Sequence, residues 1–427
     1  MIPHSNKFDL TLDREQWIKD NPSVCVAPYA ETQYRLNYIS PCCHYDPRGT
    51  EESNGINRFI IQVKSNIESG LVDKQCKFCH SQESRGQLSG RVRDLISYDS
   101  EQIVDFLKNK KTKEHTDVFT FGNKCNMACR MCNEKSSSLY DSIWNRKKNI
   151  SIESISLNAE YWEHIKSDIR HKIENTEIYR IIVTGGEGTI QDDLYKLTDW
   201  LIGENLSDQV HLRIATNGSV FLDEVFDNWC KKFKHLEFGI SIDSTHADNF
   251  RYVRYPVKFE KIHENLKKFM QLSNTYQNVN IIITPTFYIN NIAYLKDFLD
   301  YFKNSTMAIR DGTLTNPIFL RLASLPTAIK KQLVDQLTPL VDDYKFLDLP
   351  GNDIFKLSIK VIIDQLRVGA YSEEVWKNYL STSAKWDCLT KTDISVHNKK
   401  LWDLFSVDDK DLYHQYKNDF INRISQE

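Results

Sequence analysis

The stretch FGNKCNMACRMCNEK, residues 121–135, brings three cysteines close together in the chain: Cys125, Cys129 and Cys132. Thiols at this spacing suit four kinds of structure: a disulfide fragment, one face of a buried helix, a zinc site, or a loop that binds a redox-active metal cluster. The residues around the stretch, and then the rest of the chain, decide between them.

The composition is that of an ordinary globular protein. Of its 427 residues, 41% are hydrophobic and 26% are charged, and the length predicts two or three domains. No apolar run approaches the roughly 20 residues that span a bilayer, and the first residues lack the apolar segment of a signal peptide. We therefore expect a cytoplasmic protein with reduced thiols, which favours metal binding or catalysis over disulfides. With a net charge of −3, we expect neither nucleic acid nor a membrane as a partner.

The helix and zinc interpretations are weaker than the cluster interpretation. The spacing i, i+4, i+7 would suit a helix face, but Gly122 and the strand-like residues before it argue against a helix that begins so early. A structural zinc site usually needs a fourth ligand, and none lies nearby in the sequence. Three thiolates suit a [4Fe–4S] cluster with one open iron. Lys124 and Arg130 would offset its negative charge, unless they face water.

Strand and helix patterns alternate from about residue 113 to residue 325. The strand-like runs are DVFTFGNK, EIYRIIVTGG, QVHLRIATNG, LEFGISID, VNIIITPTFY and PIFLRLAS, with helical patterns such as QDDLYKLTDWLI and FEKIHENLKKFM between them. This alternation predicts an α/β fold with a parallel sheet or barrel, whose functional groups lie at the C-terminal ends of the strands. The cysteine loop, TGGE, TNG and SIDS each follow a strand, so we expect them to meet at one rim.

Two other regions flank this block. Residues 1–112 contain five cysteines and helical pieces such as INRFIIQVKSNIESG, whereas residues 326–427 have helical patterns throughout, for example DIFKLSIKVIIDQLRVG. We therefore expect three domains: a small cysteine-rich α+β domain (1–112), the α/β block (113–325) and a helical C-terminal extension (326–427).

At this point the sequence resembles the radical SAM enzymes, over residues from about 115 to 325. The resemblance implies a partial (β/α)6 TIM-like barrel and a [4Fe–4S] cluster on Cys125, Cys129 and Cys132. It also implies that the open iron binds the amino and carboxylate groups of S-adenosyl-L-methionine. The family commonly has an aromatic residue over the adenine before the third cysteine. Here that residue is Met131, whose thioether can also pack on a purine.

The motif after the second strand resembles the GGE motif of the family, which receives the methionine amino group. It consists of Thr184, Gly185, Gly186 and Glu187. The family usually has proline next, where this chain has Gly188. Such a motif alone is often only a turn, so its weight comes from its place behind a strand and after the cysteine loop.

Two later motifs match in the same order. Asn217 of TNG, and Ser241 and Asp243 of SIDS, resemble strand-end residues of the family that lie near the ribose and the substrate. The segment FRYVRYP, residues 250–256, is similar to a basic stretch in which Arg251 or Arg254 would pair with a carboxylate.

The N-terminal cysteines suggest a second metal site. They are Cys25, Cys42, Cys43, Cys76 and Cys79. A zinc site on four of them is one interpretation. The layout also resembles the twitch or SPASM auxiliary domains of radical SAM enzymes, here ahead of the barrel, and implies a second, auxiliary [4Fe–4S] cluster. Adjacent side chains in a strand point to opposite faces, so Cys42 and Cys43 should not both be ligands. We favour Cys42, with Cys43 as the alternative.

The remaining features are less informative. Cys230 lies on an apolar helical stripe and is expected in the core, whereas Cys388 is either buried beside Trp386 or a late ligand or hydrogen donor. The segment SQESRGQLSGR matches the same group of enzymes, and we assign it only a turn and salt bridges, involving Glu83, Arg85, Gly86 and Arg91.

Together these patterns predict a radical SAM oxidoreductase or transferase. It would cleave S-adenosylmethionine reductively to a 5′-deoxyadenosyl radical and abstract hydrogen from a substrate, which we expect to be a peptide or protein. The alternatives are a dehydrogenase of a small sugar-like or nucleoside metabolite and a non-enzymatic zinc or Fe–S interaction protein. The enzyme would need an electron donor such as flavodoxin or ferredoxin.

Overall fold

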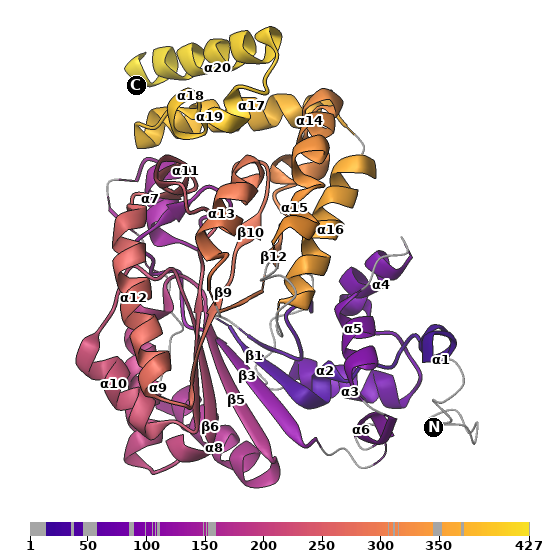
Figure 1. Ribbon diagram of the computed structural model, residues 1–427. Helices are drawn as coiled ribbons and strands as arrows, with labels where there is room; N and C mark the ends of the chain where they lie inside the picture. Colours follow the sequence, from indigo (N-terminus) through magenta and orange to yellow (C-terminus); the bar gives the residue numbers. More distant parts are fainter. Residues whose placement is uncertain are drawn as a thin grey trace.

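A computed structural model gives the fold of the chain (Figure 1). It describes residues 14–35, 38–45, 58–84, 89–98, 100–104, 106, 108, 112–147, 149–150, 152, 159–305, 307–310, 312–314, 316–344, 352–368 and 371–426. None of the helices among these residues is both long and apolar enough to cross a membrane.

The centre of the molecule is an eight-stranded sheet with the order β11-β9-β7-β6-β5-β3-β1-β2. Its strands from β3 to β11 run parallel and follow one another in chain order. They are β3 (Glu114–Thr120), β5 (Ile178–Thr184), β6 (Val210–Thr216), β7 (His235–Ile240), β9 (Val279–Ile283) and β11 (Ala308–Ile309). This sheet of six successive strand–helix units confirms the predicted α/β class and the partial (β/α)6 barrel.

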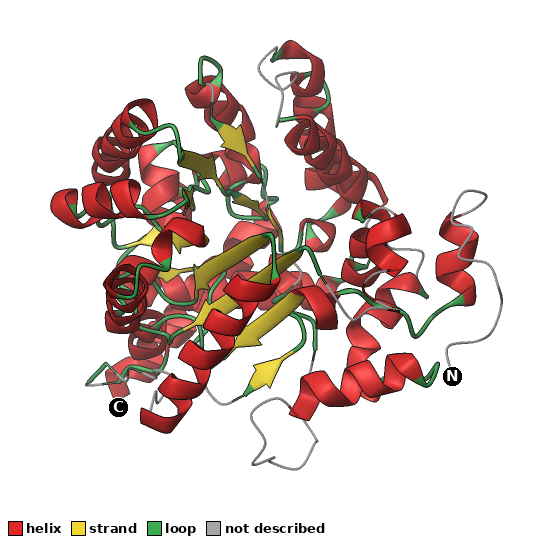
Figure 2. Ribbon diagram, turned by 90° about the horizontal axis from the view of Figure 1, so that it is seen from below, coloured by secondary structure: helices red, strands yellow, loops and turns green. Residues whose placement is uncertain are grey.

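Helices cover one face of the sheet (Figures 1 and 2). Along β3, β5 and β6 every second side chain is buried, as expected for strands with one helix-covered face. Five long helices alternate with the strands: α8 (Ala159–Asn175), α9 (Asp192–Gly203), α10 (Asp223–Lys232), α12 (Phe259–Thr275) and α13 (Leu295–Phe302). Their apolar stripes and the buried strand residues form the main core.

Short elements lie near the rim. They are β4 (Ala128–Cys129), α7 (Ser138–Trp144), α11 (Ala247–Val253), β8 (Arg254–Tyr255), β10 (Thr286–Phe287) and β12 (Gly312–Thr313). β4 pairs antiparallel with β8, and β10 pairs parallel with β12.

The N-terminal region adds two strands to the sheet. β1 (Glu31–Tyr34) pairs parallel with β3, and β2 (Ile39–Ser40) pairs antiparallel with β1. The rest of the region is helical: α1 (Arg14–Asp20), α2 (Ala27–Ala30), α3 (Arg58–Glu68), α4 (Lys77–Glu83), α5 (Gly90–Ser97) and α6 (Ser100–Val104). A second, smaller core lies among these elements.

The C-terminal extension is helical, as predicted. Its helices are α14 (Thr327–Leu337), α15 (Leu340–Asp343), α16 (Asp353–Val368), α17 (Glu373–Thr390), α18 (Ile394–His397), α19 (Lys399–Trp402) and α20 (Val407–Gln426). Figure 1 shows α17 to α20 stacked on the end of the molecule that also carries α7 and α11.

One strand prediction is wrong. The run PIFLRLAS was expected as the last strand, but it forms two 3₁₀ turns, Ile318–Leu320 and Leu322–Ser324. The Ser324 hydroxyl donates a 2.8 Å hydrogen bond to the Ile318 carbonyl, so the segment bonds to itself rather than to a neighbouring strand. The sixth strand is instead β11, which has only two residues.

Candidate active site

The cysteine loop begins directly after β3, as predicted. Cys129 is buried, and Cys125 and Cys132 are half-buried. Within the β4–β8 pair, Cys129 lies opposite Arg254, and the Arg130 amide donates a 3.1 Å hydrogen bond to the Val253 carbonyl. The segment after β7 therefore holds the middle of the loop.

Serines after the third cysteine support the loop from the other side. The Ser138 hydroxyl accepts a 3.2 Å hydrogen bond from the Cys125 amide. The Ser137 hydroxyl donates a 2.5 Å bond to the Met127 carbonyl and accepts one from the Tyr140 amide, which caps α7. Sequence reasoning missed these residues, although SSS ahead of a helix is a capping signal.

Two glycines let the end of β5 approach the loop closely. Gly185 and Gly186 have φ angles of +82° and +54°, in the left-handed region that favours glycine. A Cβ atom on Gly186 would lie 2.3 Å from the Lys124 carbonyl oxygen, and one on Gly185 would lie 2.5 Å from Thr120. The Glu187 amide then donates a 2.9 Å bond to the same Lys124 oxygen. The predicted motif therefore packs directly on the cysteine loop.

The Glu187 carboxylate ties the ends of β5 and β6 together. It is 1% exposed, and its Oε1 accepts from both the amide and the hydroxyl of Thr189 at 3.1 and 2.6 Å. It also accepts from the Thr216 hydroxyl at 2.5 Å and from the Asn217 amide at 2.6 Å. Since four protein donors use this carboxylate, Glu187 is first of all a positioning group for the rim.

A side-chain bridge joins the cysteine loop to TNG. Asn217 donates a 2.8 Å hydrogen bond to the side-chain oxygen of Asn126, which donates in turn to the Ser219 hydroxyl at 2.8 Å. Asn126 lies between the first two cysteines in the sequence. No short-range signal links residues 91 positions apart, so the bridge becomes visible only in the structure.

The remaining motif residues also reach this rim. Asp243 accepts a 2.7 Å hydrogen bond from Arg254, and both side chains are buried. The Ser241 hydroxyl lies 3.2 Å from that of Thr284, and the Thr184 hydroxyl lies 3.2 Å from that of Thr120. Of the two arginines considered from sequence, Arg254 is the one that pairs with a carboxylate, whereas Arg251 is exposed. Met131 is half-buried beside the core.

Arg130 does not face water. It is 5% exposed, and its Nη2 pairs with Asp387 of α17 and lies 2.8 Å from the Thr392 hydroxyl. Its Nε donates to the Tyr252 carbonyl at 2.8 Å. The C-terminal extension is thus attached to the cysteine loop. Lys124 is a third exposed and lies 3.2 Å from Asp192, in a surface pair.

Two thiols of the loop, those of Cys125 and Cys129, are held in their neutral form by their surroundings. Burial raises the pKa of Cys125 to about 12. A hydrogen bond with Cys132, together with burial, raises the pKa of Cys129 well above its usual range, although nearby Arg254 acts in the opposite direction. Buried thiolates therefore need a cationic partner, and binding of a metal would be coupled to loss of the thiol protons.

Four of the five N-terminal cysteines line one small cavity together with His44 and Asp73: Cys25, Cys42, Cys76 and Cys79. Cys43 does not line it and is exposed. Cys42 and Cys43 lie in a bend and turn after β2 rather than in a strand, so the alternation of strand side chains is not what separates them. Burial raises the pKa of Cys76 to about 12, and burial likewise raises the pKa of Cys25 and Cys42. The cavity is therefore lined by protonated thiols that lie near one another.

Backbone amides point at several of these thiols. Backbone hydrogen bonds from Ala27, His44 and Arg91 oppose the effect of burial on the pKa of Cys25, Cys42 and Cys79, respectively. A Cβ atom on Gly90 would lie 2.7 Å from the His44 ring. The segment SQESRGQLSGR thus has a role that its sequence did not reveal: it brings the first turn of α5 against Cys79.

A forked ion pair, in which Arg91 binds both carboxylate oxygens of Glu83, holds that segment in place. Arg91 donates to both Glu83 oxygens, at 3.0 and 2.5 Å, and to the Val24 carbonyl at 3.0 Å. The Ser89 hydroxyl donates to Glu83 at 2.6 Å and caps α5. The predicted salt bridge is confirmed for Glu83 and Arg91, whereas Arg85 and Gly86 lie outside the described residues.

The two isolated cysteines lie away from both sites. Cys230 is buried in the main core on α10, as predicted. Cys388 faces α20, and its thiol lies 3.9 Å from the Lys417 carbonyl.

The loop fits the cluster that the sequence implied. Its three thiols come from one short segment, residues 125–132, and the two glycines after β5 pack closely against it. Within the described part of the chain, no three His, Cys, Asp or Glu side chains are grouped tightly enough to ligate one metal ion. An iron–sulfur cluster makes a different demand, because its thiolates are shared out among several irons.

A comparison with known families matches the middle of the chain. Residues 119–302 match the family profile described as the Radical SAM superfamily. No curated protein matches the sequence.

Solved structures give distant matches. One is native anSMEcpe with bound AdoMet and Kp18Cys peptide, with 16% identity, coverage of 56% of this chain and 62% of that chain, and a TM-score of 0.40. Another is SuiB from Streptococcus suis bound to S-adenosylmethionine, with 11% identity, coverage of 73% and 67%, and a TM-score of 0.37. The chain spans 59% of the length of a histidine-tagged form of anSMEcpe with bound AdoMet.

Proposed function

We propose that this protein is a radical SAM enzyme that acts on a peptide or protein substrate. Cys125, Cys129 and Cys132 would hold a [4Fe–4S] cluster, and the rim around them would bind S-adenosylmethionine. The observation that carries the proposal is the contact of Gly185 and Gly186 with the cysteine loop, within a domain that matches the Radical SAM superfamily. A loop made of three thiols and closed by glycines suits a cluster that keeps one iron open.

When bound, the cluster and S-adenosylmethionine together supply reductive cleavage of the sulfonium C–S bond and a 5′-deoxyadenosyl radical that takes hydrogen from the substrate. The protein supplies position. The Asn126–Asn217 bridge and the Glu187 carboxylate fix the loop, β5 and β6 relative to one another. The Arg254–Asp243 pair places a buried cation beside Cys129.

The C-terminal extension would keep water from the site. Trp386 of α17 is 2% exposed and packs with Tyr140 and Ala128 in a small apolar cluster, which also touches Cys132. Excluding water protects a reactive radical from side reactions. In this proposal the N-terminal region (1–112) would transfer electrons, and the α/β block (113–325) would be the radical SAM barrel. The C-terminal extension (326–427) would cover the site.

We assign the N-terminal cavity to an auxiliary [4Fe–4S] cluster. Four thiols, amide donors aimed at three of them, and the Glu83–Arg91 fork support a metal–thiolate site. With four thiolate ligands such a cluster would have no open iron, so its role would be electron transfer to or from the substrate, fed by a donor such as flavodoxin or ferredoxin. Zinc in this cavity is the competing assignment, and metal analysis separates the two.

A polar substrate suits the face of the sheet opposite the helices. That face carries the ion pairs Arg213–Glu237 at 3.0 Å and Arg180–Glu114 at 2.6 Å. A peptide offers many polar groups to such a surface, and the cysteine layout of the N-terminal region resembles that of enzymes that mature peptides. A small sugar-like metabolite is the alternative substrate.

The test is anaerobic reconstitution with iron and sulfide, followed by addition of dithionite and S-adenosylmethionine. We expect about eight irons per chain from two four-iron clusters, and release of 5′-deoxyadenosine. Cys129→Ala should abolish the release, whereas Cys388→Ala, which changes a thiol facing α20, should retain it. Parent protein that binds iron but never releases 5′-deoxyadenosine would refute the proposed activity.

A further inference from the structure

The Tyr288 hydroxyl is a buried polar group without a partner. The residue is 0% exposed, and none of the described residues accepts or donates a hydrogen bond at this oxygen. A buried hydroxyl left unpaired costs about 1–3 kcal/mol. Such a group, close to the rim that carries the cysteine loop, calls for a partner from outside the polypeptide.

The backbone of Tyr288 is fixed to the rim. Its amide donates a 2.8 Å hydrogen bond to the Asn291 side chain, which donates in turn to the Asp243 carbonyl at 2.9 Å. Asp243 pairs with Arg254, and Arg254 lies opposite Cys129 in the β4–β8 pair. A continuous set of contacts thus sets the position of Tyr288 relative to the cysteine loop.

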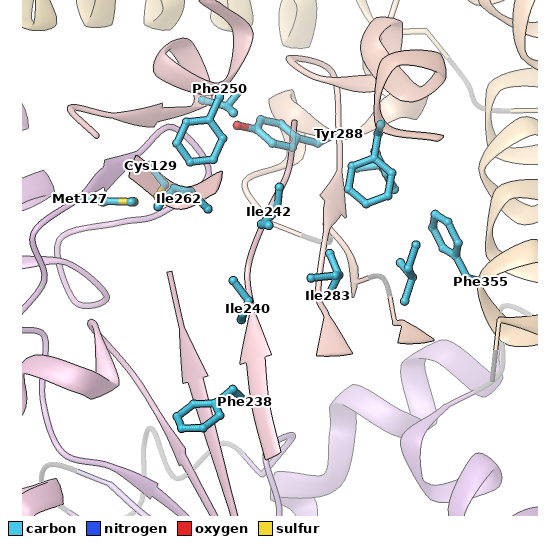
Figure 3. Packing of buried hydrophobic residues seen from close by; sticks show 14 of the residues in the cluster. Met127, Cys129, Phe238, Ile240, Ile242, Phe250, Ile262, Ile283, Tyr288 and Phe355 are labelled. Carbon is cyan, nitrogen blue, oxygen red and sulfur yellow. The ribbon is translucent and has the colours of Figure 1, made fainter. Parts of the chain in front are cut away.

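The side chain lies on the cysteine side of the rim. In Figure 3 the Tyr288 hydroxyl points toward the side of the view on which Phe250 and Cys129 lie. Burial, then the charges of Asp243 and Cys129, raise the pKa of Tyr288 well above its usual range. The hydroxyl therefore stays protonated and can donate a hydrogen bond.

We propose that the Tyr288 hydroxyl donates a hydrogen bond to a sulfur atom of the cluster held by Cys125, Cys129 and Cys132, and so makes that cluster easier to reduce. The inference rests on the proposed function. A hydrogen bond to sulfur stabilises the more negative, reduced state, and such bonds are one of the means by which proteins set cluster potentials. Tyr288 is therefore a positioning and tuning residue rather than a catalytic one.

Tyr252 offers a matched control. It too is 0% exposed with an unpartnered hydroxyl. Its ring, however, lies under Arg130, 3.6 Å from the guanidinium carbon, and the charges that act on it are those of Arg130 and Asp387 rather than a cysteine. Removing either hydroxyl deletes one buried oxygen, but the Tyr252 ring packs on Arg130, whereas the Tyr288 backbone is held through Asn291 to Asp243 at the rim.

The experiment compares the reconstituted parent, Tyr288→Phe and Tyr252→Phe in an EPR-monitored redox titration without S-adenosylmethionine. Tyr288→Phe should lower the ratio of reduced to oxidised cluster at a fixed potential by about tenfold, equal to about 59 mV for a one-electron couple. Tyr252→Phe should match the parent. Pulsed EPR in H₂O and D₂O should detect one more exchangeable proton coupled to the cluster in the parent and in Tyr252→Phe than in Tyr288→Phe.

Three results would overturn the inference: an unchanged potential and proton coupling in Tyr288→Phe, an equal shift in both variants, or a shift that occurs only when S-adenosylmethionine is bound. The last would assign the hydroxyl to that ligand instead. Failure of the proposed function would look different, because the parent itself would then show no reducible cluster.

Discussion

Gly186 is the residue at which the geometry of the rim is tightest. Its φ angle is +54°, and a Cβ atom added to it would lie 2.3 Å from the Lys124 carbonyl oxygen. There is therefore no room for a side chain at this position. Gly186→Ala should lower the free energy of unfolding by at least about 1–2 kcal/mol, the cost of a left-handed L-residue. It should also reduce the iron bound by the loop. Denaturant unfolding and iron assays measure both effects.

Gly203, at the end of α9, provides the control. A Cβ there would meet nothing within 4 Å, and its φ is not in the left-handed region. Gly203→Ala should keep the parent's iron content and be as stable as the parent or slightly more so. If both alanine variants retained full iron and stability, the close packing of Gly186 on the cysteine loop would not be needed for either.

Cys42 and Cys43 differ in one respect that matters for the auxiliary site. Only Cys42 lines the N-terminal cavity, while Cys43 is exposed near Glu31. Cys42→Ala should therefore lose about four irons per chain, whereas Cys43→Ala should lose none. Iron and sulfide analysis of the two variants measures this difference. Equal loss in both, or loss only in Cys43→Ala, would contradict the ligand assignment.

For the individual residues of the site, the sequence predicted which motifs meet but not which hydrogen bonds join them. The cysteines, TGGE, TNG and SIDS carry recognisable residue types and each follows a strand, so their convergence follows from the parallel sheet. The Asn126–Asn217 bridge and the Ser138 bond to the Cys125 amide depend on the three-dimensional course of the loop. Neither residue type stands out in a polar loop sequence.

Among the helices of the C-terminal extension, α17 contacts the cysteine loop directly through Asp387. Asp387 accepts hydrogen bonds from Arg130, from the Thr392 hydroxyl and from the Ile394 amide, and it is 1% exposed. Trp386 beside it packs on Tyr140 of α7 with ring centroids 4.7 Å apart. α17 thereby fixes Arg130 between the second and third cysteines.

Asp387→Asn should break this attachment. A buried ion pair that loses one partner costs about 3–5 kcal/mol, so we expect a loss of that size in the free energy of unfolding. A chelator should also remove iron from the loop several-fold faster than from the parent. Denaturant titration measures the free energy of unfolding. The rate at which the absorbance of the iron–chelator complex increases measures the removal of iron.

The control is on the same helix. Glu373→Gln removes an exposed pair with Lys377, at 2.6 Å, near the start of α17. It should leave both the stability and the rate of iron loss at the parent values. Iron release from Asp387→Asn as slow as from this control would show that α17 does not cover the site.

Element prediction succeeded where periodicity is long and failed where it is short. Helices such as α12 and strands such as β5 have several residues in phase, and they occur where predicted. The run PIFLRLAS alternates over too few residues to separate a strand from 3₁₀ turns. The role of α17 could not be predicted at all, because Asp387 and Arg130 are 257 residues apart.

For the whole molecule, the main finding absent from the sequence is that the N-terminal region joins the central sheet. A buried network makes this connection: Lys172 of α8 lies 2.7 Å from Asp117 of β3 and 3.1 Å from both Thr32 and Tyr34 of β1. Side chains from one helix and two strands are thus joined by one ammonium group. β1 was not predicted because it is short and lies in a region of mixed composition.

This network predicts acid sensitivity. Burial alone would raise the pKa of Asp117, but Lys172 and His115 outweigh it and lower the pKa to about 2, from 3.8. A carboxyl with a depressed folded-state pKa stabilises the fold above its unfolded value, and that contribution is lost as the pH falls toward 2. At 1.36 kcal/mol per pKa unit the contribution is about 2 kcal/mol.

Unfolding of the apoprotein by denaturant at pH values from 5 down to 3 measures the contribution of Asp117 to the free energy of unfolding. The parent should lose stability over this range more steeply than Asp117→Asn, whose amide does not titrate. Asp199→Asn, at an exposed position on α9, should follow the parent. Identical slopes in the parent and Asp117→Asn would show that the network does not couple the N-terminal region to the barrel.

The central claim is that Cys125, Cys129 and Cys132 hold a four-iron cluster with one iron free of protein ligands. Anomalous diffraction at the iron edge, from crystals of the full chain reconstituted anaerobically, tests it most directly. We expect a cluster bound to these three thiolates, with no fourth side chain on the remaining iron. A single metal ion at the loop, a fourth protein ligand, or no anomalous density between the three sulfur atoms would contradict it.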